Sequence, residues 1–442
     1  MPDFAKGFAK GFAKGLAALL IALMLAPCAA TAAPAARAAR RTAAAAQASA
    51  STPAARALAV VAATGRAAPA ATSEASGFRA AWVCSVLNLD FPSQKGLGSA
   101  ALKKEIDAII ANAAELKLNA LIVQVRPSGD AMYKSALFPW SEYLSGVQGV
   151  APADGFDPLA YWIEQAHKKG IEIHAWINPY RVTHPSAKIT DAGMLAASNP
   201  ARLKPSRVIE YNGALYYDPA LYENKRLIIN GVAEIIRNYD VDGIHLDDYF
   251  YPGADFPDDA SYGKYAAGAD RANWRRVNVN DVIKGVKRVI ARSKKNIRFG
   301  VSPFAIWQNA SSSPLGSDTR GNESYSAMFA DSRRWVKSGW VDYICPQIYW
   351  YQGFEIADYT KLLGWWVDVC KGTGVDLYVG HAAYREAERA ADDEHWGGEM
   401  LRQLKYNAEK YPDAVKGSVF FRYKSLTGEL GRQIAAYYAA AK

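Results

Sequence analysis

From residue 78 onwards the sequence alternates between short runs typical of buried β-strands and longer runs with helical spacing of apolar residues. The expected strands are residues 79–86, 120–127, 172–181, 243–250, 297–307, 341–350, 376–385 and 417–423. Eight strands, each followed by a helix, predict an α/β fold, the closed (β/α)₈ TIM barrel. A doubly wound open sheet is the alternative, but it usually has fewer strands and a glycine-rich phosphate turn, which does not follow the first strand here.

The expected strands share a second property, because each begins apolar and ends with polar or aromatic residues. Enzymes with this fold build their sites at the C-terminal rim of the barrel, where the strands end. Long loops follow the third, fourth and fifth strands at residues 182–223, 251–278 and 308–327. Loops of this length are able to wall a cleft, so we expect the functional site at this rim.

The fourth strand ends in adjacent aspartates, within the sequence DVDGIHLDDYFYP at residues 240–252. Alternation directs His245 and Asp247 to one face of the strand, whereas Asp248 lies at the turn, where alternation weakens. A carboxylate at the rim can act as acid, base, nucleophile or electrostatic stabiliser. We therefore predict Asp247 and Asp248 as the catalytic pair. The alternative is that Asp248 only caps the following loop.

A second catalytic carboxylate is harder to find, although glycosidases usually use two carboxyl groups. The sixth strand ends in Gln347 and Tyr349 rather than in an acid. The candidates in the loops are Asp90, Asp130, Glu142 and Asp318. Alternatively, the 2-acetamido group of a sugar supplies the nucleophile, and Gln347 and Tyr349 hold that group.

Other residues near the strand ends are candidates for binding a substrate. They are Arg126, Asn178, Tyr180, Arg181, His245, Tyr249, Trp307, Gln347, Tyr349, Trp350 and Arg385. The aromatic rings either pack against sugar faces or anchor the core. The arginines either bind a carboxylate of the substrate or form salt bridges at the rim. The histidines of the strands lack the pattern of a metal-dependent barrel, so we predict neither a metal nor a cofactor.

The first 76 residues differ in composition from the rest. Residues 1–32 combine a lysine-bearing start, a short apolar run and small residues near Ala32, which predicts a signal peptide. Residues 33–76, almost all Ala, Arg, Ser, Thr and Pro, predict a disordered tether before a barrel domain at 77–442. We expect export to the periplasm or cell envelope without a transmembrane segment. Cys28, at the end of LAPC, leaves lipidation as the alternative to soluble export.

Charge and cysteine content narrow the functional classes further. Most of the net charge of +9 lies before the barrel, so the barrel itself is only mildly basic, which argues against nucleic acid as a partner. The cysteines after Cys28 are Cys84, Cys345 and Cys370, an odd number with no zinc-site spacing. The simplest interpretation is that these three are small buried apolar residues. No protein partner is indicated.

Eight motifs in order are similar to those of the glycosyl-hydrolase-like family 10 barrels. They are FRAAWVCSVLNLDFPS, LIVQVRPSGDAMY, LFPWSEYLSG, IHAWINPYRV, VDGIHLDDYFYP, FGVSPFAIWQN, PLGSDTRG and VDYICPQIYW. The resemblance covers about residues 78–425. It implies a TIM barrel that acts, after export, on peptidoglycan glycan strands that have lost their peptides at division sites.

The sequence departs from one related pattern. GIHLDD and PQIYW also resemble chitinase-type barrels, in which a carboxylate two residues beyond an aspartate is the acid. Tyr249 occupies that position here, so Asp247 and Asp248 are the pair to test. Two alternatives stay open beside a peptidoglycan hydrolase: a hydrolase of another hexosamine polysaccharide, and a glycan-binding barrel without turnover.

Overall fold

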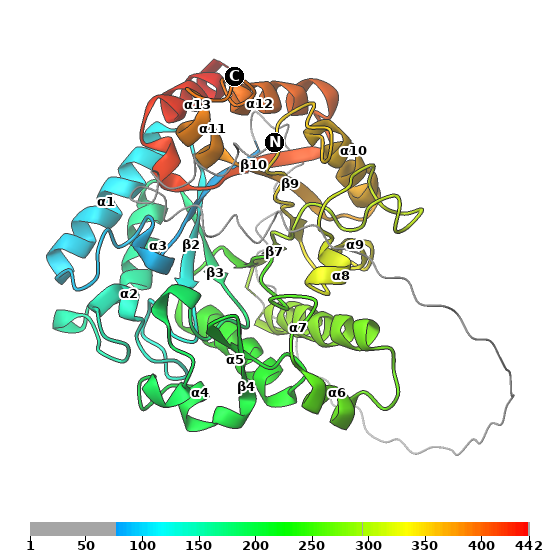
Figure 1. Ribbon diagram of the computed structural model, residues 1–442. Coiled ribbons are helices and arrows are strands. Elements are labelled where there is room, and N and C mark those ends of the chain that lie inside the picture. Colours follow the sequence, from blue (N-terminus) through cyan, green and yellow to red (C-terminus); the bar gives the residue numbers. More distant parts are fainter. Residues whose placement is uncertain (1–76, 294, 441–442) are drawn as a thin grey trace, which may run out of the picture. The chain divides into compact units, whose positions relative to one another are not determined.

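The computed structural model describes residues 77–293 and 295–440. Within them, eight parallel strands close into a barrel in the order β1-β10-β9-β8-β7-β6-β3-β2, and the helices lie around this barrel (Figure 1). The predicted (β/α)₈ barrel is therefore confirmed. The predicted signal peptide and tether lie outside the described residues.

The barrel strands are β1 Phe78–Val83, β2 Ala120–Arg126, β3 Glu172–Ile177, β6 Gly243–Leu246, β7 Arg298–Val301, β8 Tyr343–Ile344, β9 Asp376–His381 and β10 Val415–Phe420. The helices are α1 Ser99–Glu115, α2 Glu142–Ser145, α3 Pro158–Lys168, α4 Pro200–Leu203, α5 Tyr222–Asn238, α6 Asp259–Tyr265, α7 Arg271–Ser293, α8 Ser324–Ala327, α9 Ser332–Lys337, α10 Tyr359–Cys370, α11 Ala383–Arg389, α12 Glu399–Lys410 and α13 Glu429–Ala440. Short 3₁₀ turns lie at Val86–Asn88, Ala153–Gly155, Pro185–Ala187, Ala192–Met194, Pro205–Arg207 and Tyr423–Leu426.

Large and small residues alternate inside the barrel so that its interior is filled. The buried cluster there includes Trp82, Trp176 and Tyr343, each from a different strand or strand end. Gly300 and Gly243 make room for the rings of Tyr343 and His174, because a Cβ on Gly300 would lie 1.9 Å from the Tyr343 ring and one on Gly243 would lie 2.3 Å from the His174 ring. The interior is thus a packed core, and substrate can reach only its ends.

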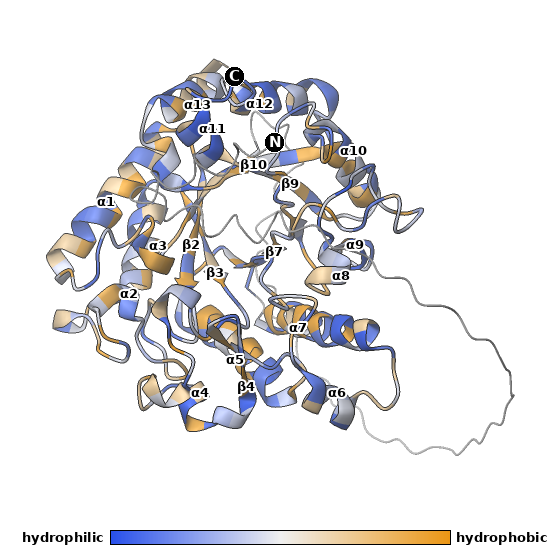
Figure 2. Ribbon diagram, viewed as in Figure 1, coloured by the Kyte–Doolittle hydropathy of each residue, from blue (hydrophilic) through white to orange (hydrophobic). Residues whose placement is uncertain are grey.

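The outer helices form where the sequence supplies caps and an apolar stripe. Asp157 begins α3 by accepting hydrogen bonds from the backbone N–H groups of Leu159 and Ala160, with Pro158 at the first helical position. The buried face of α5 includes Ile228, which packs inward with its helical neighbours. Figure 2 shows α5 and α7 each carrying apolar and polar residues, as expected for helices that cover a barrel.

The strands end earlier than the sequence predicts. The predicted strands 297–307 and 341–350 are β7 and β8, of four and two residues, followed by isolated bridges such as Phe304 with Gln347. Pro303 and Pro346 lack the N–H that a regular ladder requires, so the chain leaves the sheet and becomes rim. The loop at 182–223 contains an antiparallel hairpin, β4 Val208–Tyr211 and β5 Ala214–Tyr217, which the sequence analysis did not predict.

No helix in the described ranges, 77–293 and 295–440, is long and apolar enough to cross a membrane.

Candidate active site at the C-terminal rim

The paired aspartates lie directly after β6, at the C-terminal rim of the barrel. His245 points into the barrel core, where its ring nitrogens contact the hydroxyls of Tyr343 (3.0 Å) and Ser302 (2.9 Å). Asp247 continues the same inward row one layer higher, as alternation predicts. Both carboxylates are largely shielded from solvent, with Asp247 2% and Asp248 8% exposed.

Asp247 is held by donors from β3 and from its own loop. The indole Nε1 of Trp176 donates to Oδ2 at 3.1 Å, and the amide of Asn178 donates to the same oxygen. The backbone N–H of Tyr249 donates to Oδ1 at 3.3 Å. These donors fix the orientation of the carboxylate, which matches a group that must stabilise or orient a reacting sugar.

A further layer of hydrogen bonds orients Asn178. Gln124 of β2 donates from Nε2 to Asn178 Oδ1 at 2.6 Å, and its own Oε1 accepts from the backbone N–H groups of Ser85 (3.0 Å) and Val86 (2.9 Å). The sequence analysis named Asn178 but missed Trp176 and Gln124. Two features of the sequence could have indicated them. Alternation along β3 places Trp176 on the same face as Asn178, and Gln124 is a polar residue with apolar neighbours inside strand β2.

Asp248 lies nearer the solvent and faces the end of β8. The side chain of Gln347 interacts with it, while Gln347 Nε2 donates to Ser302 O at 2.9 Å. Burial raises the pKa of the Tyr349 hydroxyl most, followed by Tyr384 and Cys345, and Tyr349 is close enough for the charge of Asp248 to add to this effect. The structure thus brings together the predicted acid and the two residues predicted to hold an acetamido group.

Burial raises the pKa of both aspartates, because a carboxylate is poorly solvated in this environment. The neighbouring charge of Asp248 raises the pKa of Asp247 further, whereas Arg181 acts in the opposite direction on both. The pair therefore keeps a proton at a pH at which two exposed aspartates would both be ionised. A retained proton is what a general acid requires.

Arg181, a predicted substrate-binding residue, is close enough to lower the pKa of both aspartates. Its Nε and Nη2 both donate to the carbonyl of Pro127, at 2.9 and 2.7 Å, and its guanidinium lies 5.4 Å from the ring centre of Tyr249. Arg181 is therefore fixed to the loop after β2. It influences the aspartates through space and forms no salt bridge with either of them.

The predicted aromatic residues divide into two groups. Tyr349 packs against Tyr384 and Phe421 near the aspartates, and Trp350 is partly exposed. Trp307 is buried: it donates to Asp331 at 3.1 Å and stacks on Trp365 at 5.9 Å. The ring of Trp307 is therefore part of a separate packed cluster.

Three other candidates are also buried away from the rim surface. A shift of register after Gln124 turns Arg126 outward, against Gly231 of α5, with its guanidinium 3.8 Å from the Phe138 ring centre. Tyr180, like His245, is fully buried. These three side chains, each with an exposed fraction of 0%, have no surface open to a substrate in this conformation.

Arg385 differs from these three because it is partly exposed. Its Nε donates to the hydroxyl of Tyr384 at 3.0 Å, and Tyr384 in turn packs against Tyr349. Arg385 therefore stays a candidate for contacting a substrate at the edge of the site.

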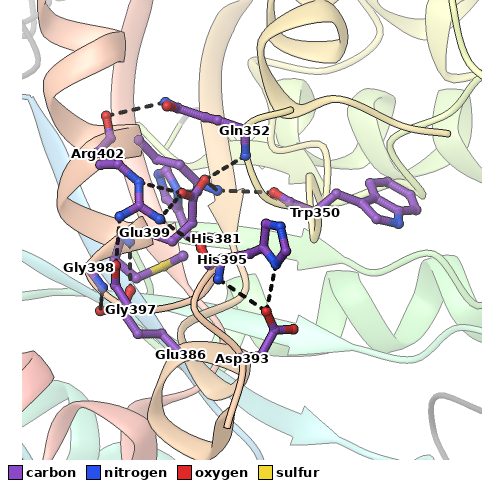
Figure 3. A network of polar contacts seen from close by, with 12 residues as sticks. Trp350, Gln352, His381, Glu386, Asp393, His395, Gly397, Gly398, Glu399 and Arg402 are labelled. Carbon is purple, nitrogen blue, oxygen red and sulfur yellow. Dashed lines mark hydrogen bonds and ion pairs between the residues drawn. The ribbon is translucent and has the colours of Figure 1, made fainter. Parts of the chain in front are cut away.

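The loop after β8 is anchored by a network of polar contacts (Figure 3). Glu399 Oε1 accepts from the backbone N–H of Gln352 (2.8 Å) and from Gln403 (2.9 Å), while its Oε2 accepts from Arg402 (2.9 Å). Gln403 also donates to the carbonyl of Trp350 at 3.1 Å. Figure 3 shows the Trp350 indole pointing away from this network, so the network holds the backbone, while the ring packs edge-on against Phe304 at 6.0 Å and stays partly exposed.

Three of the four loop carboxylates are engaged in ion pairs. Asp318 pairs with Lys361 at 2.5 Å on the surface, Glu142 pairs with Lys95 at 2.5 Å, and the buried Asp90 pairs with Arg422 at 3.0 Å. The fourth, Asp130, is buried and makes no salt bridge to a described residue. Within residues 77–293 and 295–440, no group of three or more His, Cys, Asp or Glu side chains is arranged to hold a metal ion.

The sequence matches the glycosyl hydrolase-like 10 family over residues 77–397. The chain belongs to this family. It is 43% identical to glycosyl hydrolase YngK of Bacillus subtilis over 357 residues, which cover 79% of this chain and 68% of YngK. It is 36% identical to glycosyl hydrolase DigH of Escherichia coli K12 over 392 residues, covering 84% and 88% of the two chains. The predicted resemblance is thus confirmed.

Among solved structures, the chain is similar to the glycoside hydrolase domain of PgaB (BpsB) from Bordetella bronchiseptica. The TM-score is 0.50 at 12% sequence identity, with 81% of this chain and 98% of that chain covered. This similarity supports the barrel fold.

Proposed function

We propose that this barrel hydrolyses O-glycosidic bonds in amino-sugar glycans, and that its substrate is the peptidoglycan glycan strand after its peptides have been removed. Membership of a glycosyl hydrolase-like family supports the reaction class. The observation that carries the proposal is the buried pair Asp247 and Asp248 at the rim, where their raised pKa values keep a proton available.

The roles of the two aspartates follow from their surroundings. Asp248 gives its proton to the bridging oxygen as the bond from that oxygen to the anomeric carbon breaks. Asp247, held by Trp176 and Asn178, stabilises the positive charge that develops on the sugar.

The nucleophile in this proposal is the substrate's own acetamido oxygen, which forms a bond to the anomeric carbon as the leaving group departs. Gln347 and Tyr349 orient that group from the end of β8. Water then attacks the anomeric carbon, breaks the bond to the acetamido oxygen and returns a proton to Asp248. Substrate assistance is favoured because Asp90, Glu142 and Asp318 are engaged in ion pairs, and Asp130 is buried in the lining of a separate cavity among the loops after β2 and β3.

The same observation favours a second candidate, a glycan-binding barrel without turnover, because that function requires no further carboxylate. Release of new reducing ends from purified, peptide-free glycan strands separates the two. We expect release by the wild-type protein and by Asp318→Asn, whose carboxylate is on the surface. Binding to the strands without release would support the binding function, and cleavage of chitin-type oligomers alone would indicate another hexosamine substrate.

Export to the cell envelope is part of the proposal and is supported by the composition of residues 1–32. Fractionation of cells that produce the full chain tests it, since the mature protein should leave the cytoplasm. Cys28→Ala distinguishes the two forms of export. Membrane association that this change abolishes would indicate lipidation in place of a soluble protein.

A further inference from the structure

A cavity of about 230 Å³ lies among the loops that follow β2 and β3. Its lining includes Ser128, Asp130, Glu142, Val147, His184 and Met194. Val182, which also lines it, directly follows Arg181, the residue that acts on the aspartate pair. The cavity is therefore next to the candidate active site in the same rim, but none of its lining residues belongs to that site.

Two polar groups that line this cavity have unused hydrogen-bonding capacity. Asp130 is 1% and Ser128 4% exposed. Asp130 Oδ2 accepts from Gln148 at 3.1 Å, and the Ser141 hydroxyl also lowers the pKa of this carboxyl. Its Oδ1 and the hydroxyl of Ser128 make no hydrogen bond of good geometry to a described residue. Such groups are costly to bury. A ligand that donates hydrogen bonds would offset that cost.

The charges around the cavity favour a cationic donor. The charge of Glu142 is already matched by Lys95. Arg126 acts on Asp130 only through space, and burial is the main reason that the pKa of Asp130 is raised to about 6. Asp130 is therefore ionised at neutral pH, without a cation bonded to it among the described residues. An ammonium group supplies both the positive charge and the hydrogen bonds.

The remaining lining favours a sugar over a simple amine. His184 accepts a hydrogen bond from the backbone N–H of Ser186 at its Nδ1 (3.1 Å), so Nε2 carries the hydrogen of the neutral ring. Burial and then Arg181 lower the pKa of His184 to about 4, which keeps the ring neutral at pH 7. Val147 and Met194, 60% and 65% exposed, add an apolar edge. An amino sugar matches these features, because its hydroxyl groups can accept from His184 and its carbon ring can pack against Val147 and Met194.

We propose that this cavity is a subsite for one amino-sugar ring that bears a free primary amine, with the ammonium group on Asp130 and Ser128. The volume is below the roughly 300–1,000 Å³ of sites for drug-sized ligands, so it suits a single ring. The inference rests on the proposed function in one respect, because it takes the substrate to be an amino-sugar glycan. The subsite would select strands in which some acetamido groups have been removed.

Binding of the glucosamine disaccharide and of its di-N-acetylated form, followed by NMR titration, tests the subsite without any cleavage. We expect the amine form to bind the wild-type protein at least about tenfold more tightly than the acetylated form. Asp130→Asn should weaken amine binding at least about tenfold by removing the charge, whereas Asp318→Asn should leave it unchanged. Equal affinity of the two sugars, or no effect of Asp130→Asn, would overturn the proposal.

A second pair of variants keeps the test valid if Asp130→Asn does not fold. Met194→Lys places a cation at the cavity, whereas Leu203→Lys changes an equally exposed apolar residue elsewhere (61%). Only Met194→Lys should weaken binding of the amine sugar. Tighter binding of Nα-acetyl-lysine than of the sugar would point to a peptide amine and overturn the sugar assignment. None of these experiments measures hydrolysis. Their results can therefore be interpreted even if the protein does not cleave the glycan.

Discussion

Glu399 and the pair Asp247 and Asp248 are buried carboxylates near the same rim, yet their surroundings differ. Each oxygen of Glu399 accepts a hydrogen bond, and one of them is paired with Arg402. Asp247 also accepts hydrogen bonds at both oxygens, but neither aspartate forms an ion pair with a described residue, and Arg181, which lowers the pKa of both, donates its hydrogen bonds to Pro127. A carboxylate that is paired with a cation stabilises a loop. Two adjacent carboxylates without a paired cation retain a proton that can be used in chemistry.

The largest effect on folding should come from changing Trp307, which is buried, whereas Trp350 near the same rim is partly exposed. Trp307 is enclosed by Asp331, Tyr325 and Trp365. Trp307→Ala should therefore lower the free energy of unfolding by about 3–5 kcal/mol, the usual cost of removing a buried ring. Urea unfolding measures this change. Trp350→Ala, made as the matched variant, should cost much less stability.

The same two substitutions should affect glycan affinity in the reverse order, with Trp350→Ala having the larger effect. If the ring of Trp350 contacts a sugar, Trp350→Ala should weaken oligosaccharide binding by about 1–3 kcal/mol. Trp307→Ala, in the fraction that stays folded, should bind nearly as well as wild type. Calorimetric titration with glycan oligomers distinguishes the roles. Weakened binding by Trp307→Ala alone would contradict the division.

A smaller loss of stability is expected from Glu399→Gln. The amide is uncharged and has only one acceptor oxygen, so the ion pair with Arg402 and at least one hydrogen bond are lost, and the free energy of unfolding should fall by about 1–3 kcal/mol. Thermal unfolding at pH 7 provides the measurement. Asp318→Asn, which removes an exposed ion pair with Lys361, is the control and should leave the melting temperature unchanged. Equal effects of the two changes would show that the network in Figure 3 does not stabilise its loop.

Much of this architecture could be predicted from the sequence, because alternation and chain order are local properties. The barrel, the inward direction of Asp247 and the proximity of Asn178 all follow from strand parity. The alternation of side chains between two faces no longer holds where a strand ends. Because β7 ends at Val301, six residues before Trp307, alternation could not place the Trp307 ring. The register shift after Gln124 likewise turned Arg126 away from its predicted place. Such features depend on contacts between distant segments, which a single sequence does not display.

The smallest expected effect is on the pH dependence of the free energy of unfolding. Burial raises the pKa of Asp247 and Asp248 in the folded chain, so the folded state binds more protons than the unfolded state between the two sets of pKa values. The contribution of the pair to stability is therefore greatest below the unfolded pKa of about 4 and is lost as pH rises through the folded values. Asp247→Asn should flatten this dependence. Denaturant unfolding from pH 4 to pH 8 measures it, and an unchanged slope would contradict the raised pKa.

The most direct test of the central claim compares rate and stability in the same preparations of Asp247→Asn and Asp248→Asn. Asparagine keeps the shape but cannot ionise or donate an acidic proton. Each variant should release reducing ends from peptide-free glycan strands at least about a hundredfold more slowly, since general acid or base groups contribute roughly 10²–10⁴ in rate. Both should fold, bind the strands and be at least as stable as wild type at pH 7. Near-normal turnover in both variants, or a loss of turnover that only follows a loss of folding, would contradict the account.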